Sequence, residues 1–425
     1  MRILALPPEA PPMLRRLTSG LRRAALGAGA LGVAAFAPQI ARAATVHVTV
    51  AYYSAATGPY FKQMAAAFEK THPGTTIKID VVNWNNLQQV LQTDVSGGVP
   101  PDISIIGTRW LLSFVKDGIA EPLDSFMTPA FRNRFIPVFL KPGEIGGKVY
   151  GLPIAASARA LFYNKTLLTK AGFPNGPKTW NDVIAAAKKI KAMGAYGFGL
   201  QGKEIETDVY WYYALWSYGG HLMGANGKVA FDSAAGVKAL TLYKTMVDQG
   251  LTEPGVTNYT REDLQNLFKQ GRLGMVITAP FLIGQIAKEA PKLAYGIVPV
   301  PTGTVQSTYA VTDSIVMFKA SKVKKQAWQF LDFLFTKDNR VLFNKNEGFL
   351  PTTRAVAADP YFQDNKQLQV FVNLLPKAHF APVIRGWENV AKAVIDAVQS
   401  VYLGKAQPAA ALKTAATSAD RALAQ

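Results

Sequence analysis

The chain of 425 residues is 49% hydrophobic and 17% charged, which is typical of globular proteins and long enough for two cored domains. It contains no cysteine, which excludes thiol catalysis and a disulfide framework. The formal net charge is +18, and six Arg and one Glu precede residue 44, which leaves +13 for the remainder. Because the lysines are scattered over predicted helix faces, the pattern favours a solvated basic surface and no nucleic-acid partner.

Residues 1–43 have the composition of an export signal. Two arginine pairs precede an apolar run at 24–37, and residues 41–43 match the A-x-A cleavage pattern. We therefore expect a periplasmic protein that is cleaved after Ala43 and, without a cysteine to acylate, is not lipid-anchored. Met13 is an alternative start, and the arginine pairs leave Sec and twin-arginine export both open.

The segment after residue 44 alternates strand and helix patterns. Strands are predicted at 46–53, 77–81 and 103–106, with helices at about 59–71 and 87–97 between them. This order predicts a parallel sheet with helices on both faces, whose ligands bind beyond the carboxyl ends of the strands. Each of the three loops there combines aromatic and polar groups, which suits the C–H faces and hydroxyls of a sugar. The candidate binding residues in these loops are Tyr53, Trp84, Asn85, Arg109 and Trp110.

Residues 151–194 contain the most specific run of motifs. Gly151-Leu152-Pro153 predicts a strand that ends or bends at the proline, and an apolar strand is expected at 160–165. A loop rich in glycine and proline then leads to Thr179. With Asp182 three residues later, Thr179 predicts a capping box at the start of a helix that ends at Gly194.

This run of sequence motifs resembles family 1 of the extracellular solute-binding proteins, the maltose-binding-protein-like receptors of ABC importers. Their first inter-lobe crossing reads G-x-P, L-x-Y-N-K, A-G and P-x-T-W, and further similarity covers almost the whole chain after residue 44. The resemblance implies an α/β, two-lobed periplasmic-binding-protein-like fold of type II. Each lobe would be a doubly wound, mainly parallel sheet, and several strands would form the hinge. The first lobe would comprise residues 44–154 with 302–352, and the second lobe 155–301 with 353–425.

The resemblance also implies binding residues in the second lobe. The segment at 210–216 is similar to a helix that supplies an aromatic ring to the cleft, which indicates Tyr210 and Trp211. Residues 271–281 resemble G-x-x-G-M-x-I-x-G-P-W, but alanine replaces the third glycine and Phe281 replaces the tryptophan. A smaller aromatic platform is therefore implied.

Three more candidates lie in the last third of the chain. Asp313 stands where relatives usually have glycine, and we predict that it hydrogen-bonds ligand hydroxyls or pairs with Arg109. Arg354 follows a G-x-L-P stretch similar to the family and is interpreted either as a ligand contact or as a hinge ion-pair partner. Trp387 opens a helix in a family region whose aromatic ring often faces the cleft.

The motifs of common enzymes are incomplete in this sequence. No P-loop and no G-x-S-x-G motif occurs, and the four histidines are far apart, so we predict no metal, no cofactor and no catalysis. The predicted function is that of a monomeric substrate-binding component of an ABC importer. It would capture a sugar or polyol between its lobes and deliver it to permease subunits in the inner membrane.

Three alternatives stay open at this point. The arginines and the positive charge allow an anionic ligand such as a glycerol or sugar phosphate. A cluster of tyrosines at positions 210, 212 and 213 allows a ferric-ion receptor. The carboxylates of Glu204, Glu206 and Asp208 allow a secreted carbohydrate-active enzyme, although a loop of solvated or ligand-bonding carboxylates is the better interpretation.

Overall fold

The computed structural model describes residues 44–203 and 205–424, so the predicted export signal at 1–43 and Glu204 lie outside the described residues. The strands are β1 (Ala44–Tyr52), β2 (Thr75–Asn83), β3 (Ile103–Gly107), β4 (Glu144–Ile145), β5 (Lys148–Val149), β6 (Gly151–Ala158), β7 (Ala160–Asn164), β8 (Tyr196–Phe198), β9 (Leu273–Thr278), β10 (Tyr295–Val298), β11 (Thr308–Met317) and β12 (Ala378–His379). The α-helices are α1 (Thr57–Thr71), α2 (Trp84–Ser96), α3 (Leu111–Lys116), α4 (Pro129–Arg132), α5 (Pro137–Leu140), α6 (Lys165–Lys170), α7 (Trp180–Ala192), α8 (Thr207–Ser217), α9 (Ala234–Asp248), α10 (Arg261–Lys269), α11 (Phe281–Glu289), α12 (Lys324–Leu334), α13 (Lys337–Glu347), α14 (Arg354–Ala357), α15 (Pro360–Gln363), α16 (Lys366–Leu374), α17 (Trp387–Tyr402) and α18 (Pro408–Leu423). Short 3₁₀ helices are η1 (Thr108–Trp110), η2 (Lys141–Gly143), η3 (Val256–Asn258) and η4 (Leu375–Lys377).

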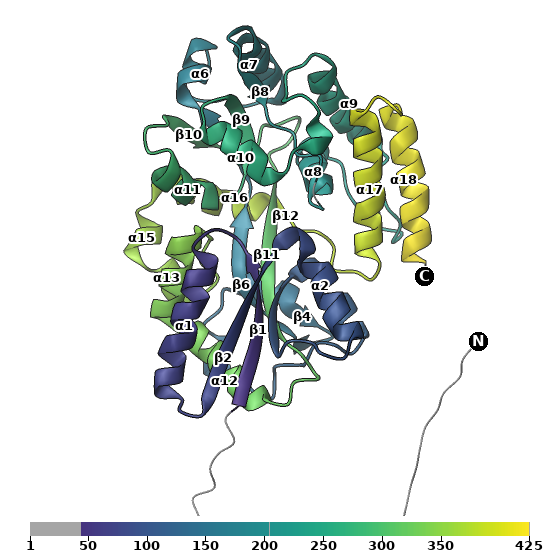
Figure 1. The fold of residues 1–425 in the computed structure, drawn as a ribbon. Helices are drawn as coiled ribbons and strands as arrows, with labels where there is room; N and C mark the ends of the chain where they lie inside the picture. Colours follow the sequence, from purple (N-terminus) through teal and green to yellow (C-terminus); the bar gives the residue numbers. More distant parts are fainter. Residues whose placement is uncertain (1–43, 204, 425) are drawn as a thin grey trace, which may run out of the picture. The chain divides into compact units, whose positions relative to one another are not determined.

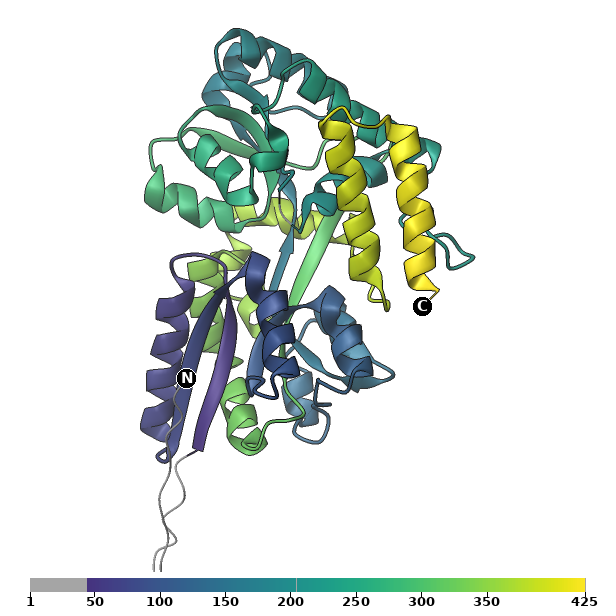
Figure 2. The ribbon, with the colours of Figure 1, turned by 45° about the vertical axis from the view of Figure 1, so that its right-hand side comes forward.

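The first sheet has the strand order β12-β11-β3-β1-β2, and β6 also pairs with β11. Strand β1 is parallel to both β2 and β3, as the alternating strand and helix patterns predicted. Parallel neighbours need a crossover, and α1 and α2 supply these crossovers from opposite sides of the strands in both views (Figures 1 and 2). Strand β11 runs antiparallel to β3 and β6.

The second sheet has the order β10-β7-β9-β8. Its strand directions are more mixed than the mainly parallel sheet that we predicted. Strands β8 and β9 are parallel, but β7 is antiparallel to both β9 and β10. The reversal has a simple cause, because β7 enters this sheet directly from β6 and so runs against its later neighbours.

Two large hydrophobic cores belong to these sheets, and β6 passes from one core to the other. Leu152 and Ile154 are buried in the core of the first sheet, whereas Ala156 and Ala158 are buried in the core of the second. Strand β11 does the same in the opposite direction, with Tyr309 in the second core and Ile315 in the first. The two strands pair along most of their length and lie side by side between the sheets (Figure 1). The fold is therefore two-lobed with a multi-strand connection, as predicted.

The division of the chain into lobes stays a proposal at the level of single residues. The predicted boundary between residues 154 and 155 falls inside β6, close to the point where its side chains change from one core to the other. The late helices α17 and α18 pack against each other and against α8 and α9. Among the described residues, no helix has the length and apolar character that crossing a membrane requires.

Candidate functional site

The loops that follow β1, β2 and β3 meet at one edge of the first sheet. Register explains this, because Tyr52 lies opposite Asn83 in the parallel pair and Gly107 lies opposite Asp313 in the antiparallel pair. Tyr53, Trp84 and Asp313 are therefore brought to the same edge from segments far apart in the sequence.

The aromatic side chains at this edge form two layers. The rings of Trp84 and Trp110 are stacked, with centroids 5.2 Å apart and planes at 23°. Trp110 is only 1% exposed and packs against the inner face of Trp84, whereas Trp84 is partly exposed. Gly107 makes the stack possible, because a Cβ atom there would lie 3.2–3.3 Å from atoms of both indoles. One face of Trp84 is thus covered by Trp110, and its ring also lies near that of Tyr53, with centroids 6.4 Å apart.

An irregularity in the strand pair lies next to Asp313. The register between β6 and β11 shifts between Asp313 and Ser314, which leaves Ile154 without an opposite residue. The buried guanidinium of Arg340 donates a hydrogen bond to the carbonyl of Ile154 at this bulge. The bulged residue belongs to β6, and Asp313 on β11 keeps its regular pairing with Gly107 of β3 at the edge where Tyr53 lies.

The carboxylate of Asp313 has one free oxygen. Tyr53 Oη donates to Oδ2 at 2.7 Å, while buried Oδ1 has no hydrogen-bond partner among the described residues. The residue is 5% exposed, and burial raises the pKa of Asp313 to about 7 despite the hydrogen bond from Tyr53. We predicted a contact with ligand hydroxyls or with Arg109. The structure pairs Asp313 with Tyr53 and not with Arg109, whose guanidinium contacts Asp208 and Glu388. The contact with ligand hydroxyls stays a prediction.

Arg109 connects the two lobes. From η1 it contacts Asp208 on α8, with Nη1 3.3 Å from Oδ2. It also contacts Glu388 on α17 at two points, because Nε lies 2.8 Å from Oε1 and Nη2 donates to Oε2 at 2.8 Å. Burial alone would lower the pKa of Arg109, but Asp208 and Glu388 outweigh it and hold that pKa well above its usual value. The guanidinium is therefore a permanent cation whose charge is already compensated.

Asp208 is the buried member of this network. Burial raises the pKa of Asp208 to about 6, because the cost of desolvation, with the nearby Glu388 and Glu206 carboxylates, exceeds the stabilisation by Arg109. Glu206, two residues earlier in the chain, pairs with Arg261 at 2.9 Å. Two of the carboxylates considered above for glycoside hydrolysis are thus ion-pair partners of arginines.

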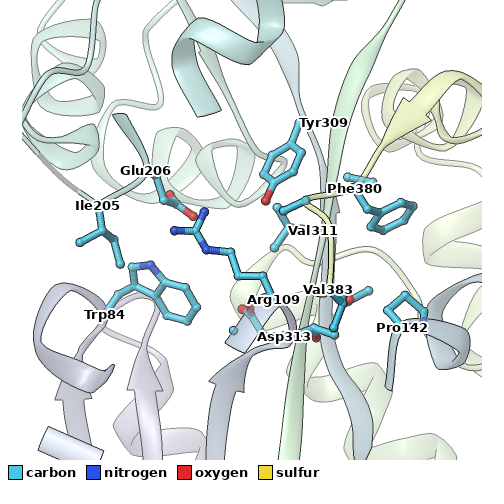
Figure 3. Close-up of a pocket in the computed structure, with 15 residues that line it drawn as sticks. Trp84, Arg109, Pro142, Ile205, Glu206, Tyr309, Val311, Asp313, Phe380 and Val383 are labelled. Atoms are coloured by element: carbon cyan, nitrogen blue, oxygen red, sulfur yellow. The ribbon is translucent and has the colours of Figure 1, made fainter. Parts of the chain in front are cut away.

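An inner cavity of about 40 Å³ lies between these groups (Figure 3). In Figure 3 the indole of Trp84, the guanidinium of Arg109 and the carboxylate of Asp313 surround it from the side of the first lobe. The cavity is lined by Trp84, Gly107, Thr108, Arg109, Pro142, Ile205, Glu206, Tyr309, Ala310, Val311, Thr312, Asp313, Phe380, Ala381 and Val383. The sequence did not indicate Tyr309, Phe380 or Val383, which lie on the connecting segments. The aromatic residues next to the predicted inter-lobe crossings were the one feature of the sequence that could have indicated Tyr309 and Phe380.

Two predicted second-lobe residues lie in the core and do not line the inner cavity. Tyr210 is buried, and its hydroxyl donates to the carbonyl of Ile277 at 2.7 Å. Trp211 is 0% exposed and packs edge-on against Phe231. The reason is that α8 is buried on every face, so neither ring is free to form a wall.

Other predicted residues lie near the inner cavity but outside it. Phe281 is half-buried, with the guanidinium carbon of Arg261 5.3 Å from its ring centroid. Trp387 is 1% exposed and lines a second space, the outer cavity of about 510 Å³ between α2, α3 and the start of α17. Asn85 is exposed in a side hollow of about 450 Å³ next to α17.

Arg354 lies elsewhere. It is exposed at the start of α14 and lines a surface hollow with Arg132, Phe135 and Glu144. Among the described residues no ion pair of Arg354 is found, and Arg354 does not line the inner cavity. Whether any of the predicted residues touches a ligand stays a prediction.

The geometry defines a class of protein. Two cored lobes are joined by a strand pair and enclose a cavity with one aromatic face and a buried acceptor, which is the arrangement of a two-lobed binding protein. No group of three or more potential metal ligands occurs in residues 44–203 and 205–424.

Comparison with known proteins gives the family. Residues 53–341 match the family described as bacterial extracellular solute-binding protein. A protein of Brucella abortus (strain 2308), named only as a binding protein, is 55% identical over 387 residues, which is 90% of this chain and 94% of its own. The chain belongs to the bacterial extracellular solute-binding proteins, and it is a binding protein rather than an enzyme.

More distant relatives have named ligands. The galactooligosaccharide-binding protein of Bacillus subtilis (strain 168) is 24% identical over 374 residues, covering 84% of this chain and 85% of its own. A solute-binding protein of Thermotoga lettingae, solved with α-D-tagatose, superimposes with a TM-score of 0.84 at 25% identity and covers 89% of this chain and 100% of its own. The GacH receptor of Streptomyces glaucescens, with a TM-score of 0.82 at 24% identity, covers 90% of this chain and 99% of its own and shares the fold.

Proposed function

We propose that this protein is the periplasmic substrate-binding component of an ABC importer and that its ligand is a neutral sugar or polyol. The ligand occupies the inner cavity, contacts both lobes and favours the closed arrangement, which the permease then recognises. Transport with a permease and a periplasmic location rest on family membership and on the export signal predicted from the sequence.

One observation carries the choice of ligand. Beside the inner cavity, Asp313 Oδ1 is a buried acceptor without a donor, and Trp84 Nε1 is a buried donor without an acceptor, in the part of the chain that the structure describes. A hydroxyl group satisfies both needs because it donates and accepts. The partly exposed indole of Trp84, which lines the cavity, suits the C–H face of a polyhydroxylated molecule.

Charge compensation supports a neutral ligand. Arg109 is paired with Asp208 and Glu388, and Arg261 is paired with Glu206. An anionic ligand would have to displace a carboxylate from a buried guanidinium, which is costly. The anionic alternative keeps one specific observation in its favour. Arg159 is buried close to the cavity-lining Tyr309, and its guanidinium donates to the hydroxyl of Ser157.

The test is a thermal-shift screen followed by titration calorimetry. The panel contains neutral sugars, polyols, and sugar and glycerol phosphates. A ligand at 100 times its Kd stabilises by about 2.7 kcal/mol, which raises Tm by a few degrees. We expect a neutral compound to give this shift, and we expect Asp313→Asn to weaken its binding about tenfold or more.

Asp332→Asn is the matched control, because Asp332 forms a surface ion pair with Arg134 in the same lobe. It should leave the affinity unchanged. Stabilisation by phosphates alone would contradict the neutral ligand and shift attention to Arg159. Equal losses of affinity in both variants would remove Asp313 from the binding site.

A further inference from the structure

Arg109 and its partners separate the inner cavity from two neighbouring spaces. Arg109 lines the inner cavity, the outer cavity and the side hollow. Glu388 lines the outer cavity and the side hollow but not the inner cavity. The Arg109–Glu388 ion pair therefore forms a wall between the small inner cavity and the larger spaces beyond it.

The wall is held from both lobes. Its first-lobe half, Arg109, follows β3 directly, and its side chain is 11% exposed. On the second-lobe side, Glu388 follows Trp387, whose buried ring anchors the start of α17. Gly386 precedes them at a φ of +77°, and a Cβ atom there would lie 3.0 Å from the carbonyl oxygen of Ala422. Because α17 starts against the end of α18, the carboxylate of Glu388 has a fixed position.

Three aromatic side chains, those of Trp84, Tyr309 and Phe380, line the inner cavity. Trp110 is stacked on Trp84, and Tyr309 is 4% exposed and stacked on Trp216. The rings of Tyr210 and Trp211 lie in the second core. Successive sugar rings of an oligosaccharide need successive flat surfaces. The three rings of the inner cavity lie on the inner side of the Arg109–Glu388 ion pair.

The two spaces differ in volume. The inner cavity measures about 40 Å³. The outer cavity is more than ten times larger, at about 510 Å³, but lies beyond the wall. A long ligand would have to cross the position of the Arg109–Glu388 ion pair.

We propose that the Arg109–Glu388 ion pair is a partition that limits the ligand to a single sugar ring or a short polyol. This inference rests on the proposed function, because it assigns a size to the neutral ligand of the same site. Opening the partition joins the inner and outer cavities and admits longer chains.

The experiment compares affinities across a series of lengths. Glycerol, erythritol, mannitol, the common hexoses, maltose and maltotriose are titrated calorimetrically into the wild-type protein and into Glu388→Ala. In the wild type, we expect affinity to fall at least tenfold from the best single-ring or linear compound to any disaccharide. In Glu388→Ala, we expect this ratio to shrink about tenfold.

The control variant is Asp396→Ala, which removes an exposed ion pair with Lys392 on the same helix α17. It should retain the wild-type ratio. A ratio is used because a merely structural effect of Glu388 would weaken all ligands alike and leave it unchanged. The melting temperature of each variant confirms that it is folded.

Two results overturn the partition and leave the proposed function intact. One is a wild-type protein that binds maltotriose more tightly than any single ring, and the other is an unchanged ratio in Glu388→Ala. Binding of phosphates alone, with no neutral compound of any length bound, would overturn both the proposed function and the partition.

Discussion

At the scale of the residue, the carboxylate of Asp313 shows what a single sequence reveals and what it hides. Its departure from the glycine usual in relatives identified it as a candidate, and the structure places it beside the inner cavity. Its partner was not predictable. The choice between Arg109 and Tyr53 depends on whether Asp208 and Glu388 already occupy the guanidinium, and those carboxylates lie 99 and 279 residues away from it.

Burial of Asp313 has a consequence for the dependence of stability on pH. Its pKa in the folded state is about 7, raised from 3.8 by burial, so the folded protein binds more protons than the unfolded chain between these values. The contribution to stability is fully present below about pH 3.8 and is lost as pH rises through about 7. We therefore expect Tm of the unliganded protein to rise as pH falls from 8 to 5.5.

Thermal melts of the wild type and Asp313→Asn across this range check the expectation. The variant should melt higher than the wild type at pH 8 and should show a flatter pH profile. Burial also raises the pKa of Glu347 to about 7 and that of Asp208 to about 6, so both contribute in the same direction and leave a residual slope. A profile of equal steepness in both proteins would show that Asp313 does not titrate in this window.

At the scale of the element, local sequence patterns predicted the strands and helices correctly wherever an element has one buried and one exposed face. The alternation at the start of the chain gave β1, β2 and β3, and the spacing of Thr179 and Asp182 gave the capping box of α7. The orientation of the aromatic rings on helix α8 was harder to predict. All eleven of its residues are buried, so the sequence contained no polar face from which to infer which rings meet solvent or ligand.

The capping box of α7 allows a test of local stability apart from binding. Thr179 Oγ1 accepts from Asp182 N at 3.1 Å, and Asp182 Oδ2 accepts from Thr179 N at 2.9 Å. Losing such a cap costs about 1 kcal/mol. We expect Thr179→Ala to lower the free energy of unfolding by about this amount in urea, with the ligand affinity unchanged.

Thr245→Ala is a suitable comparison, because that exposed hydroxyl only donates to the carbonyl of Thr241 one turn earlier in α9. Its effect should stay within about 0.5 kcal/mol. If both variants lose the same free energy, the cap of α7 has no special role. If Thr179→Ala weakens binding, the second lobe is coupled to the cavity more tightly than its distance suggests.

At the scale of the whole molecule, the resemblance of motifs predicted the two-lobed fold, and the physical patterns by themselves predicted the parallel strands β1, β2 and β3 with the helices between them. What could not be predicted is the contact between lobes. The inner cavity depends on residues 84, 109, 205, 309 and 383, which come from five separate segments. Their meeting depends on how separate strands and loops are aligned, and one sequence does not encode a strand register explicitly.

Because the whole chain has a large net charge, the salt dependence of the affinity distinguishes an anionic ligand from a neutral one. The full sequence carries +18, so an anionic ligand would be attracted at long range, and its binding would weaken as salt shortens the screening length to about 10 Å at 0.1 M. A neutral ligand has no such attraction. We expect its Kd to change less than about twofold between 50 and 500 mM NaCl in calorimetric titrations.

A steep loss of affinity with salt would indicate that the bound species is charged. Sodium sulfate at matched ionic strength serves as a control, because a competing anion in an arginine site would weaken binding further than chloride does. Similar titration curves in the two salts are the expected result.

The bulge at Ile154 links the affinity for the solute to the bending of the strands that join the lobes. Asp313 belongs to the strand pair that joins the lobes, and Arg340 fixes that pair at the same point. The group that we propose to sense the solute is thus part of the joint that must bend. Since the apparent affinity is proportional to the fraction of the protein in the binding-competent geometry, a change that biases the joint toward its closed geometry raises the affinity for the solute. Affinity in this protein can therefore evolve through residues such as Arg340, which line none of the three spaces around Arg109.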